Sequence, residues 1–428
     1  MFFYVPLAAT SILMMTTHSF FNAALSRLSS PEIYLSAFAV AKSLMHIFEG
    51  PIMMVRQTVS TLVHDAKSYF KVRKFFLIVT LLTVAVMSVI SLSDLSNWIY
   101  IHIFGVERQV AEKAVIMLII FTLFPVAAAL RNFMQGIAVK LNKTPLFTIA
   151  TIARLIYVFF LVLIVDKFTF ISGAVFAGLM FLTAVGLEGV VICLGVKISE
   201  KNIPGKLKEI KKQENEELKP KINHSYIFRF FWPLIVTSII HMTAMPLVNM
   251  GLARTYKPSI AISAFTVGWS LGLFFLSPAF LFHQQVIKYY ENSREKIRSL
   301  KKFAILLGTG MLAVLAIVAF TDIGYYILRN WIEATDQISV LALDVLKLML
   351  FMVPVILFRE YYWGVLLKEN KTRFVSYAKI INLISIVITI FVLLKINPAN
   401  PAILGVLVFI VAEGSEAVYL SYAVHKKI

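Results

Sequence analysis

One apolar stretch near the N-terminus carries ionisable side chains at helical spacing. Lys42, His46 and Glu49 stand at i, i+4 and i+7, and Arg56 follows at i+14, so a helix places all four on one face. An ionisable group in lipid costs roughly 2.5–3.5 kcal/mol on insertion scales. This face must therefore pack against polar groups or line a cavity that binds a charged solute or a proton. A histidine suits proton binding because its unperturbed pKa is about 6.5.

Two interpretations of this stripe stay open. Lys42 and Glu49 could neutralise each other through His46 and hold one half of the protein together. Alternatively, the stripe lines a central cavity with polar residues of neighbouring helices, and the cationic groups near the cytoplasmic helix ends, Arg56 among them, collect an anion or simply extend to the membrane surface. The other candidates for the cavity wall are His18, Asn22, His241, Asn249, Trp269 and His283.

A second set of charges lies at a common depth. In the first half of the chain this set comprises Arg131, Arg154 and Glu188. Each lies eight or nine residues inside its helix, or about 12–13 Å deep at a rise of 1.5 Å per residue. Three charges at one depth on three helices predict an ion cluster with a structural or gating role. The two groups are Arg131, Arg154 and Glu188 in the first half of the chain and Arg359, Lys379 and Glu416 in the second.

The helices that carry these residues occur twice in the chain. Residues 6–59 align without a gap with residues 233–286, with identity at 22 of the 54 positions, including matched Pro, Asn, Arg and Gln. Further on, Arg131 to Thr144 and Arg359 to Thr372 share the pattern R-x4-G-x3-K-x-N-K-T. Such a repeat predicts two structurally equivalent lobes. The stripe is not duplicated, since Trp269, Leu273 and Leu276 stand where Lys42, His46 and Glu49 do.

The composition predicts an all-α polytopic membrane protein. The chain of 428 residues is 59% hydrophobic and 15% charged, with a mean hydropathy of +0.82. Spanning helices need about 20 apolar residues. Twelve segments qualify, and six in each half make a parallel repeat with a site between the lobes. They are approximately 4–25, 33–59, 75–95, 114–139, 146–165, 171–196, 228–252, 259–287, 303–321, 341–366, 374–394 and 402–424.

The net charge of +18 follows the loops rather than a nucleic-acid-binding patch. Basic residues gather in every second loop, which places those loops and both termini in the cytoplasm and the protein in the plasma or inner membrane. We expect an N-lobe at 1–196, a charged linker at 197–226 and a C-lobe at 227–428, acting as a monomer without nucleic acid. The basic loops are 67–74, 140–143, 197–221, 288–302, 368–373 and the tail at 426–427.

No enzyme motif or cofactor motif is found in the sequence. It lacks a Walker lysine loop, HExxH, CxxC and GxSxG, so we expect neither an enzyme nor a metal site. Proline pairs at equivalent places, Pro51 with Pro278 and Pro125 with Pro354, predict matched helix bends in the two lobes. Matched bends suit a transporter whose lobes rock against each other.

Several motifs resemble those of one transporter superfamily. The six-plus-six repeat and the glycine-lysine turn after the fourth helix are similar to the multidrug/oligosaccharidyl-lipid/polysaccharide (MOP) exporters, which include the MATE transporters. VPLAATS at residues 5–11 and SLMHIFEGPIM at residues 43–53 resemble, more narrowly, the progressive ankylosis (ANK) protein family. The resemblance implies a V-shaped fold with a cavity between lobes, and export of small anions such as pyrophosphate, nucleotides and citrate-like acids.

These observations predict a secondary transporter that exports a small organic anion by alternating access. It needs no cofactor, although protons or sodium ions could drive it. Two alternatives remain: a cation-coupled multidrug exporter and a flippase for a lipid-linked oligosaccharide. A cavity dominated by Glu49 and aromatic rings would favour the first alternative, and a cavity open to lipid and lined by several arginines would favour the second.

Overall fold

The computed structural model describes residues 4–141, 143–167, 171–213, 223–291, 293–369 and 371–427, and the regular elements in these ranges are helices. The first half contains α1 (Tyr4–Ser26), α2 (Pro31–Met53), α3 (Val55–Leu62), α4 (Ala66–Leu92), α5 (Leu95–Trp98), η1 (Ile99–Phe104), α6 (Arg108–Phe121), α7 (Phe124–Lys140), α8 (Pro145–Ile164), η2 (Val165–Lys167) and α9 (Gly173–Ser199). The second half contains α11 (His224–Leu252), α12 (Pro258–Leu276), η3 (Ala279–Leu281), α13 (Phe282–Tyr289), α14 (Arg294–Phe320), α15 (Asp322–Tyr326), η4 (Ile327–Trp331), α16 (Asp336–Met349), α17 (Met352–Lys368), α18 (Thr372–Ile396) and α19 (Ile403–Lys427).

The helices confirm an integral membrane protein. Nine helices of the described chain are long and apolar enough to cross a membrane, and two bent pairs, α6 with α7 and α16 with α17, bring the number to eleven if each pair is one span. The first expected span, α1, has 23 residues and is not among these, so the count of twelve stays a prediction. Large apolar side chains such as Leu81, Ile305 and Phe391 are exposed on the outside, where lipid is their natural solvent.

Prolines set both the starts and the bends of the spanning helices. Helices α2, α8 and α12 begin at prolines, whose fixed φ suits the first helical turn. Within the spans, proline lacks the amide that would bond to the preceding turn. The chain accordingly bends by 46° just before Pro125 and by 44° just before Pro354. Pro51 lies within the last turn of α2, three residues before the break to α3, and Pro278 lies between α12 and η3.

The two halves have equivalent internal packing, as the sequence repeat predicts. A Cβ atom on Gly136 would lie 2.6 Å from the Val59 Cβ and 2.9 Å from the Arg56 carbonyl oxygen. A Cβ atom on Gly364 would meet Val286 and the His283 carbonyl oxygen at the same two distances. The glycine of each R-x4-G motif therefore allows the helix that carries it, α7 or α17, to contact the short helix α3 or α13.

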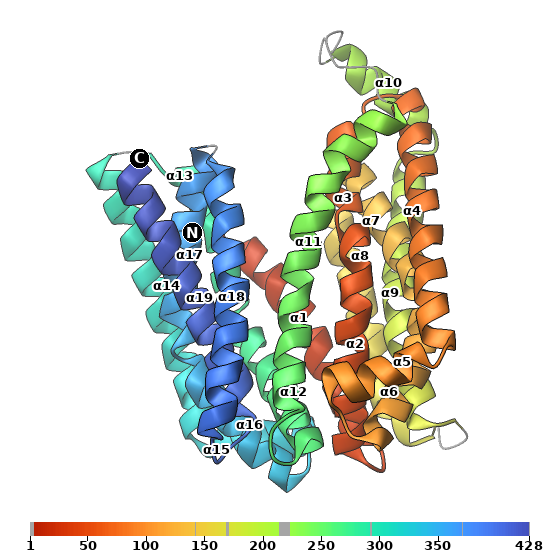
Figure 1. The fold of residues 1–428 in the computed structure, drawn as a ribbon. Coiled ribbons are helices and arrows are strands. Elements are labelled where there is room, and N and C mark those ends of the chain that lie inside the picture. The colour runs from red at the N-terminus through yellow and green to blue at the C-terminus, as the bar shows by residue number, and fades with distance from the viewer. Residues whose placement is uncertain are drawn as a thin grey trace.

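The lobes converge at one end and diverge at the other (Figure 1). Helices α10 and α13 and the C-terminus lie at the divergent end, and α5 and α15 lie at the convergent end. The linker is not an extended loop, because α9 continues to Ser199 and α10 (Ile203–Gln213) occupies part of it. The rest of the expected linker up to residue 222 falls outside the described residues.

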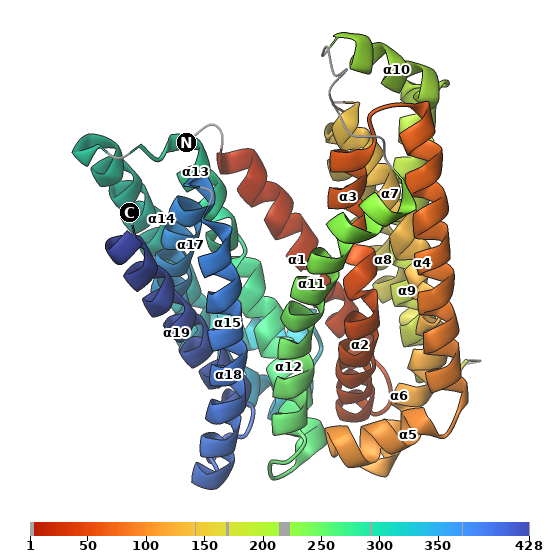
Figure 2. The same cartoon turned by 45° about the horizontal axis from the view of Figure 1, so that its top comes forward.

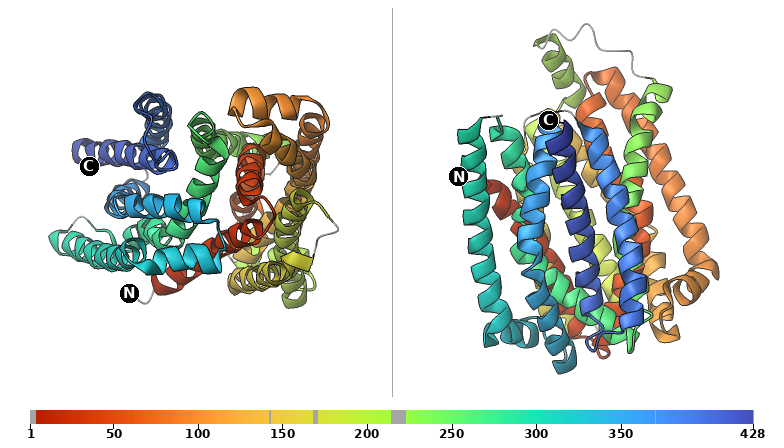
Figure 3. Two further views of the ribbon diagram at one scale, coloured as in Figure 1. Left: turned by 90° about the horizontal axis from the view of Figure 1, so that it is seen from below. Right: turned by 60° about the vertical axis from the view of Figure 1, so that its left-hand side comes forward.

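Helices α1 and α11 form much of the contact between the lobes. Helix α1 packs on α8 and α9 of its own half and on α12 and η3 of the other half. Helix α11 has the equivalent neighbours, α18 and α19 on one side and α2 and α3 on the other. Figures 2 and 3 show both helices lying between the two groups of outer helices. The first helix of each repeat is thus shared between the lobes.

Buried asparagines join the lobes by reciprocal hydrogen bonds. Asn22 of α1 donates to the Ser270 hydroxyl at 2.6 Å, and Asn249 of α11 donates to the Ser43 hydroxyl at 2.7 Å. Asn22 and Asn249 are equivalent positions in the repeat, and so are Ser43 and Ser270. Both asparagines are buried between the lobes here, where their amides need partners from the opposite lobe, and their place in a cavity wall stays a prediction.

Two arginines, also equivalent in the repeat, close the convergent end. Arg27 forms a 2.7 Å ion pair with Glu333 of the other lobe. Arg254 donates to the carbonyl oxygens of Ile103 and Phe104 at 2.8 and 3.2 Å. Arg27 thus binds just beyond the π-helical turn η4 of the opposite lobe, and Arg254 binds the last two residues of η1. We call these two contacts, together with the asparagine pairs, the outer latch, because the basic loops predict that this end faces outward.

Gly364→Ala is expected to destabilise the protein by about 1–3 kcal/mol, because the new methyl group would overlap Val286 and force α17 away from α13. Thermal unfolding in detergent measures the change. Gly414→Ala is the matched control: a Cβ atom there meets no atom within 4 Å, and alanine stabilises a helix by about 0.5–1 kcal/mol relative to glycine. Equal melting temperatures for both variants would contradict the close packing.

Candidate functional site

The first lobe contains a connected group of charged side chains, as the common depth of Arg131, Arg154 and Glu188 predicts. Arg154 of α8 binds Glu188 of α9 at 2.6 Å, and Arg131 of α7 lies 3.7 Å from the same carboxylate. Arg131 also lies 3.7 Å from Glu49 of α2. Helices α7 and α9 approach closely at Gly189, where a Cβ atom would lie 3.3 Å from the Ala127 carbonyl oxygen. We define the N-lobe cluster as His18, Lys42, His46, Glu49, Arg131, Arg154 and Glu188.

Lys42 has partners of its own within this cluster. Its Nζ lies 3.3 Å from His18 Nδ1 and 5.7 and 5.6 Å from the ring centres of Phe38 and Phe181. Aromatic faces attract a cation, so these rings hold the ammonium group of a partly exposed lysine. Glu49 lies closest to Arg131 and His46, and it stays within electrostatic reach of Lys42, so the two interpretations of the stripe both remain open.

His46 lies between Lys42 and Glu49 on α2 and keeps some exposure. Its Nδ1 is 3.8 Å from a Glu49 oxygen, and its side chain is 30% exposed, whereas that of Glu49 is 4% exposed. Three fixed cations of the cluster face two carboxylates, which leaves one excess positive charge before either histidine is protonated. Since two cationic members, Lys42 and Arg131, are partly exposed, the cluster can attract an anion.

Arg56 extends the positive charge toward the divergent end of the lobes. It is exposed on α3, and it lies within electrostatic reach of Arg131 and Glu188. Its counterpart in the repeat, His283, lies at the equivalent place on α13 and belongs to a second group of charges.

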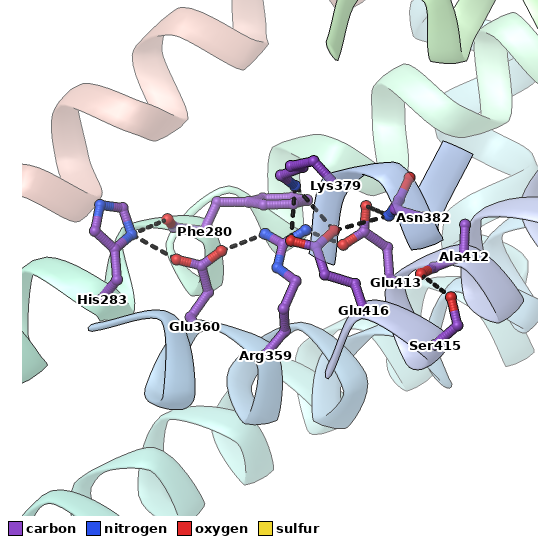
Figure 4. A network of polar contacts seen from close by, with 10 residues as sticks. All are labelled: Phe280, His283, Arg359, Glu360, Lys379, Asn382, Ala412, Glu413, Ser415 and Glu416. Carbon is purple, nitrogen blue, oxygen red and sulfur yellow. Dashed lines mark hydrogen bonds and ion pairs between the residues drawn. The ribbon is translucent and has the colours of Figure 1, made fainter. Parts of the chain in front are cut away.

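The second lobe contains its own network, drawn in Figure 4. Arg359 of α17 is paired with Glu360 and with Glu413 of α19. Lys379 of α18 binds Glu416 at 2.9 Å. The C-lobe cluster is completed by two further hydrogen bonds, from Asn382 to Glu416 at 2.9 Å and between His283 and Glu360 at 2.5 Å.

The sequence analysis did not single out Glu360 and Glu413, because in the second half it considered only charges at depths similar to those of the first-half ion cluster. Glu360 directly follows the arginine of the second R-x4-G motif, where the first copy has Asn132, and Glu413 lies one turn before Glu416. Both signals were available as departures from the repeat. With them, three carboxylates face Arg359 and Lys379, so this cluster has one excess negative charge while His283 is neutral. The two lobes therefore carry opposite excess charges.

Two other predicted cavity residues need comment. Trp269 is 9% exposed and stacks on Phe409 with ring centres 4.5 Å apart, beside Phe265, so it packs inside its lobe here, and its place in a cavity wall stays a prediction. A large apolar ring gains more from buried contact than from an aqueous wall. The side chain of His241 falls outside the described part of the chain.

The fold is that of the MOP-superfamily transporters. An inward-facing multidrug resistance MATE family transporter of that superfamily aligns with a TM-score of 0.65 and 13% identity, over 97% of this chain and 94% of the other. The lipid II flippase MurJ in an inward closed conformation aligns with a TM-score of 0.68 and 15% identity, over 98% of this chain and 87% of the other. An outward-facing multidrug resistance MATE family transporter aligns with a TM-score of 0.56 and 12% identity, over 99% of this chain and 94% of the other. Such low identities establish the fold alone.

The sequence narrows this class to one family. The profile of the progressive ankylosis protein (ANKH) family matches residues 1–262 and 215–415. The chain belongs to this family, as the VPLAATS and SLMHIFEGPIM motifs indicate. Its fold and its family are those of membrane transporters, not of enzymes.

Arg154→Met is expected to destabilise the protein by about 3–5 kcal/mol, because it leaves the buried Glu188 carboxylate without its closest cation. Chemical or thermal unfolding in detergent measures the loss. Arg108→Met is the control, since Arg108 pairs with Glu112 at 3.1 Å on an exposed face, and such pairs contribute about 0–1 kcal/mol. A loss for Arg154→Met as small as that for Arg108→Met would show that the N-lobe cluster does not hold the lobe together.

Proposed function

We propose that this protein is a secondary transporter that exports a small organic anion, of the citrate, nucleotide or pyrophosphate type, across the plasma or inner membrane. The observation that carries the proposal is the excess positive charge of the N-lobe cluster, which Lys42 and Arg131 present at a partly exposed surface. Arg56 offers a further cation toward the divergent end of the lobes. A multiply charged anion can replace the water around these groups and supply the negative charge that they lack.

The arrangement of the lobes supports alternating access. The outer latch joins the convergent end, while the lobes diverge toward α10, α13 and the C-terminus (Figure 1). The basic loops predict that this divergent end faces the cytoplasm. An anion would enter from there, and export would then require the outer latch to open while the cytoplasmic ends approach each other. Both lobes lie in one chain, so a monomer suffices, and protons or sodium ions could supply the driving force.

The structure supports the two alternatives less well. A drug exporter was expected to present aromatic rings and a carboxylate in its cavity, but Trp269 is packed on Phe409 and Glu49 is paired. A flippase for a charged lipid headgroup needs several available arginines, whereas Arg154 is buried and bound to Glu188, which leaves Arg131 and Arg56. A cavity of about 520 Å³ does lie between α1, α12 and α14, but its lining, from Tyr4 to Val314, is apolar.

Two substitutions of opposite sign test the cationic site. Lys42→Met removes a partly exposed cation and should raise the half-saturating anion concentration about tenfold or more, since a charge-assisted contact contributes about 1.5–3 kcal/mol. Glu49→Gln removes a competing carboxylate beside Arg131 and should lower the half-saturating anion concentration. Proteoliposome uptake of labelled citrate, ATP and pyrophosphate, with a cationic dye alongside, measures both effects.

The opposite directions separate electrostatics from damage to the fold, because a misfolded variant loses transport in either case. Lys74→Met, an exposed lysine at the start of α4, serves as the matched control and should leave the anion affinity unchanged. Uptake of the dye in place of the anions, or wild-type affinity in both variants, would refute the assignment.

Linking the two lobes at the outer latch is expected to stop transport. Cysteines introduced by Arg27→Cys and Glu333→Cys, in a Cys193→Ser background, can be joined by a short bis-maleimide across the ion pair. The outer end then cannot open, so uptake should fall to background after linking and not before. Arg108→Cys with Glu112→Cys is the matched control, because that pair lies within one lobe. Unchanged uptake after verified linking at the latch would argue against alternating access.

A further inference from the structure

One pair of positions differs chemically between the lobes although its surroundings are the same. In the first lobe these positions hold Arg56 and Asn132, and Asn132 donates to the Ile52 carbonyl oxygen at 2.8 Å. In the second lobe they hold His283 and Glu360, which bind each other. The contacts of Gly136 and Gly364 show that the backbones correspond. The first lobe thus has a permanent cation and a neutral amide at the positions where the second lobe has a histidine and a carboxylate, both of which can bind a proton.

The geometry of His283 shows where a proton can bind. Its Nδ1 lies 2.5 Å from Glu360 Oε2 and 3.0 Å from the Phe280 carbonyl oxygen (Figure 4). Both partners are acceptors, so Nδ1 carries a hydrogen in either charge state, and Nε2 is the atom that gains or loses the exchangeable proton. The histidine side chain is 22% exposed and that of Glu360 is 1% exposed. A proton can therefore reach the ring while the carboxylate stays buried.

The charges around this pair favour one added proton. With His283 neutral, the cluster has three carboxylates and two cations, and protonation of Nε2 makes it neutral overall. An excess buried charge is costly, and a carboxylate within hydrogen-bonding distance stabilises an imidazolium. Helix α14 presents the apolar Phe303 to this region. The titratable and charged groups from the packed elements are Tyr4 of α1, Arg359 and Glu360 of α17, Lys379 of α18, and Glu413 and Glu416 of α19.

We infer that His283 and Glu360 form a proton-binding site in the second lobe, and that its occupancy controls anion binding by the N-lobe cluster. The control of anion binding rests on the proposed function, whereas the proton-binding site does not depend on it. Without the proton, the second lobe has an excess negative charge that repels an anion held between the lobes. With the proton bound the repulsion is gone, so anion affinity is higher when the site is protonated.

A proton suits this site better than a metal ion. No three His, Cys, Asp or Glu side chains among the described residues converge as metal ligands. The earlier candidates for proton coupling, His46 and Glu49, are separated by 3.8 Å, compared with 2.5 Å for His283 and Glu360. The second-lobe pair is also the one whose cluster becomes neutral on gaining a proton.

Trp363 offers a direct readout of the site without transport. Its ring stacks on His283 with centres 5.6 Å apart and planes 19° apart, and a protonated imidazole quenches indole fluorescence. In a protein that keeps only this tryptophan, we expect fluorescence in nanodiscs to fall as the pH is lowered. His283→Gln should abolish the change. Glu360→Gln should weaken the quenching at a given pH, because the carboxylate that accepts the hydrogen bond from His283 is lost.

Trp98 provides the matched control, because it stacks on the exposed His102 with ring centres 5.4 Å apart. The protein that keeps only Trp98 should titrate identically with and without His283→Gln. A pH response of Trp363 that survives His283→Gln would overturn the site. A response to sodium ions at constant pH, absent in choline chloride, would overturn its assignment to a proton.

Anion binding to the full-tryptophan protein tests the consequence. Wild-type affinity for labelled citrate should rise as the pH falls, by about tenfold if the repulsion is about 1.4 kcal/mol. His283→Gln should bind weakly at every pH, whereas His283→Arg, the residue of the first lobe, should bind tightly at every pH. Equal affinities in these two variants would overturn the coupling. If no anion binds at all, the proposed function fails while the Trp363 titration still decides the site.

Discussion

Charge burial in a medium that solvates ions poorly is the constraint on which this architecture depends. Arg154 with Glu188, and Lys379 with Glu416, place opposite charges within 3 Å of each other at the centre of each lobe. In each lobe two consecutive helices, α8 with α9 and α18 with α19, meet at these charges. The compensation is incomplete in both lobes, and the excess charges have opposite signs. A transporter can use this imbalance, because a bound ion supplies what the protein lacks.

The contact between the lobes follows from the repeat. When two similar halves pack about an axis, each contact between them occurs twice. A residue on the first helix of one half meets a position on the second helix of the other half, and the equivalent residues make the same contact in the opposite direction. Asn22 with Ser270 and Asn249 with Ser43 are such a pair of contacts. The amides are buried there, so losing the interface leaves them unsatisfied. This gives the convergent end a discrete joined state rather than a loose contact, which is what a gate requires.

Much of the fold and part of the site could be predicted from local features. The apolar spans, the matched prolines and the depth of Arg131, Arg154 and Glu188 predicted the helices, their bends and one ion cluster, because each depends on spacing along a helix. The partners of Lys42 and Glu49 could not be predicted this way. They come from α1 and α7, and which side chains meet depends on how far each helix is rotated and tilted.

The amino-acid sequence by itself determined that the chain spans a membrane, that it has two related halves and that only one half carries Lys42, His46 and Glu49. Composition and repeat spacing suffice for these, because they do not depend on contacts between distant residues. The tertiary structure alone decided which charges pair, and therefore which lobe has an excess of each sign. It also showed that His283 binds Glu360, a contact between residues 77 positions apart that only the packing of α13 on α17 creates.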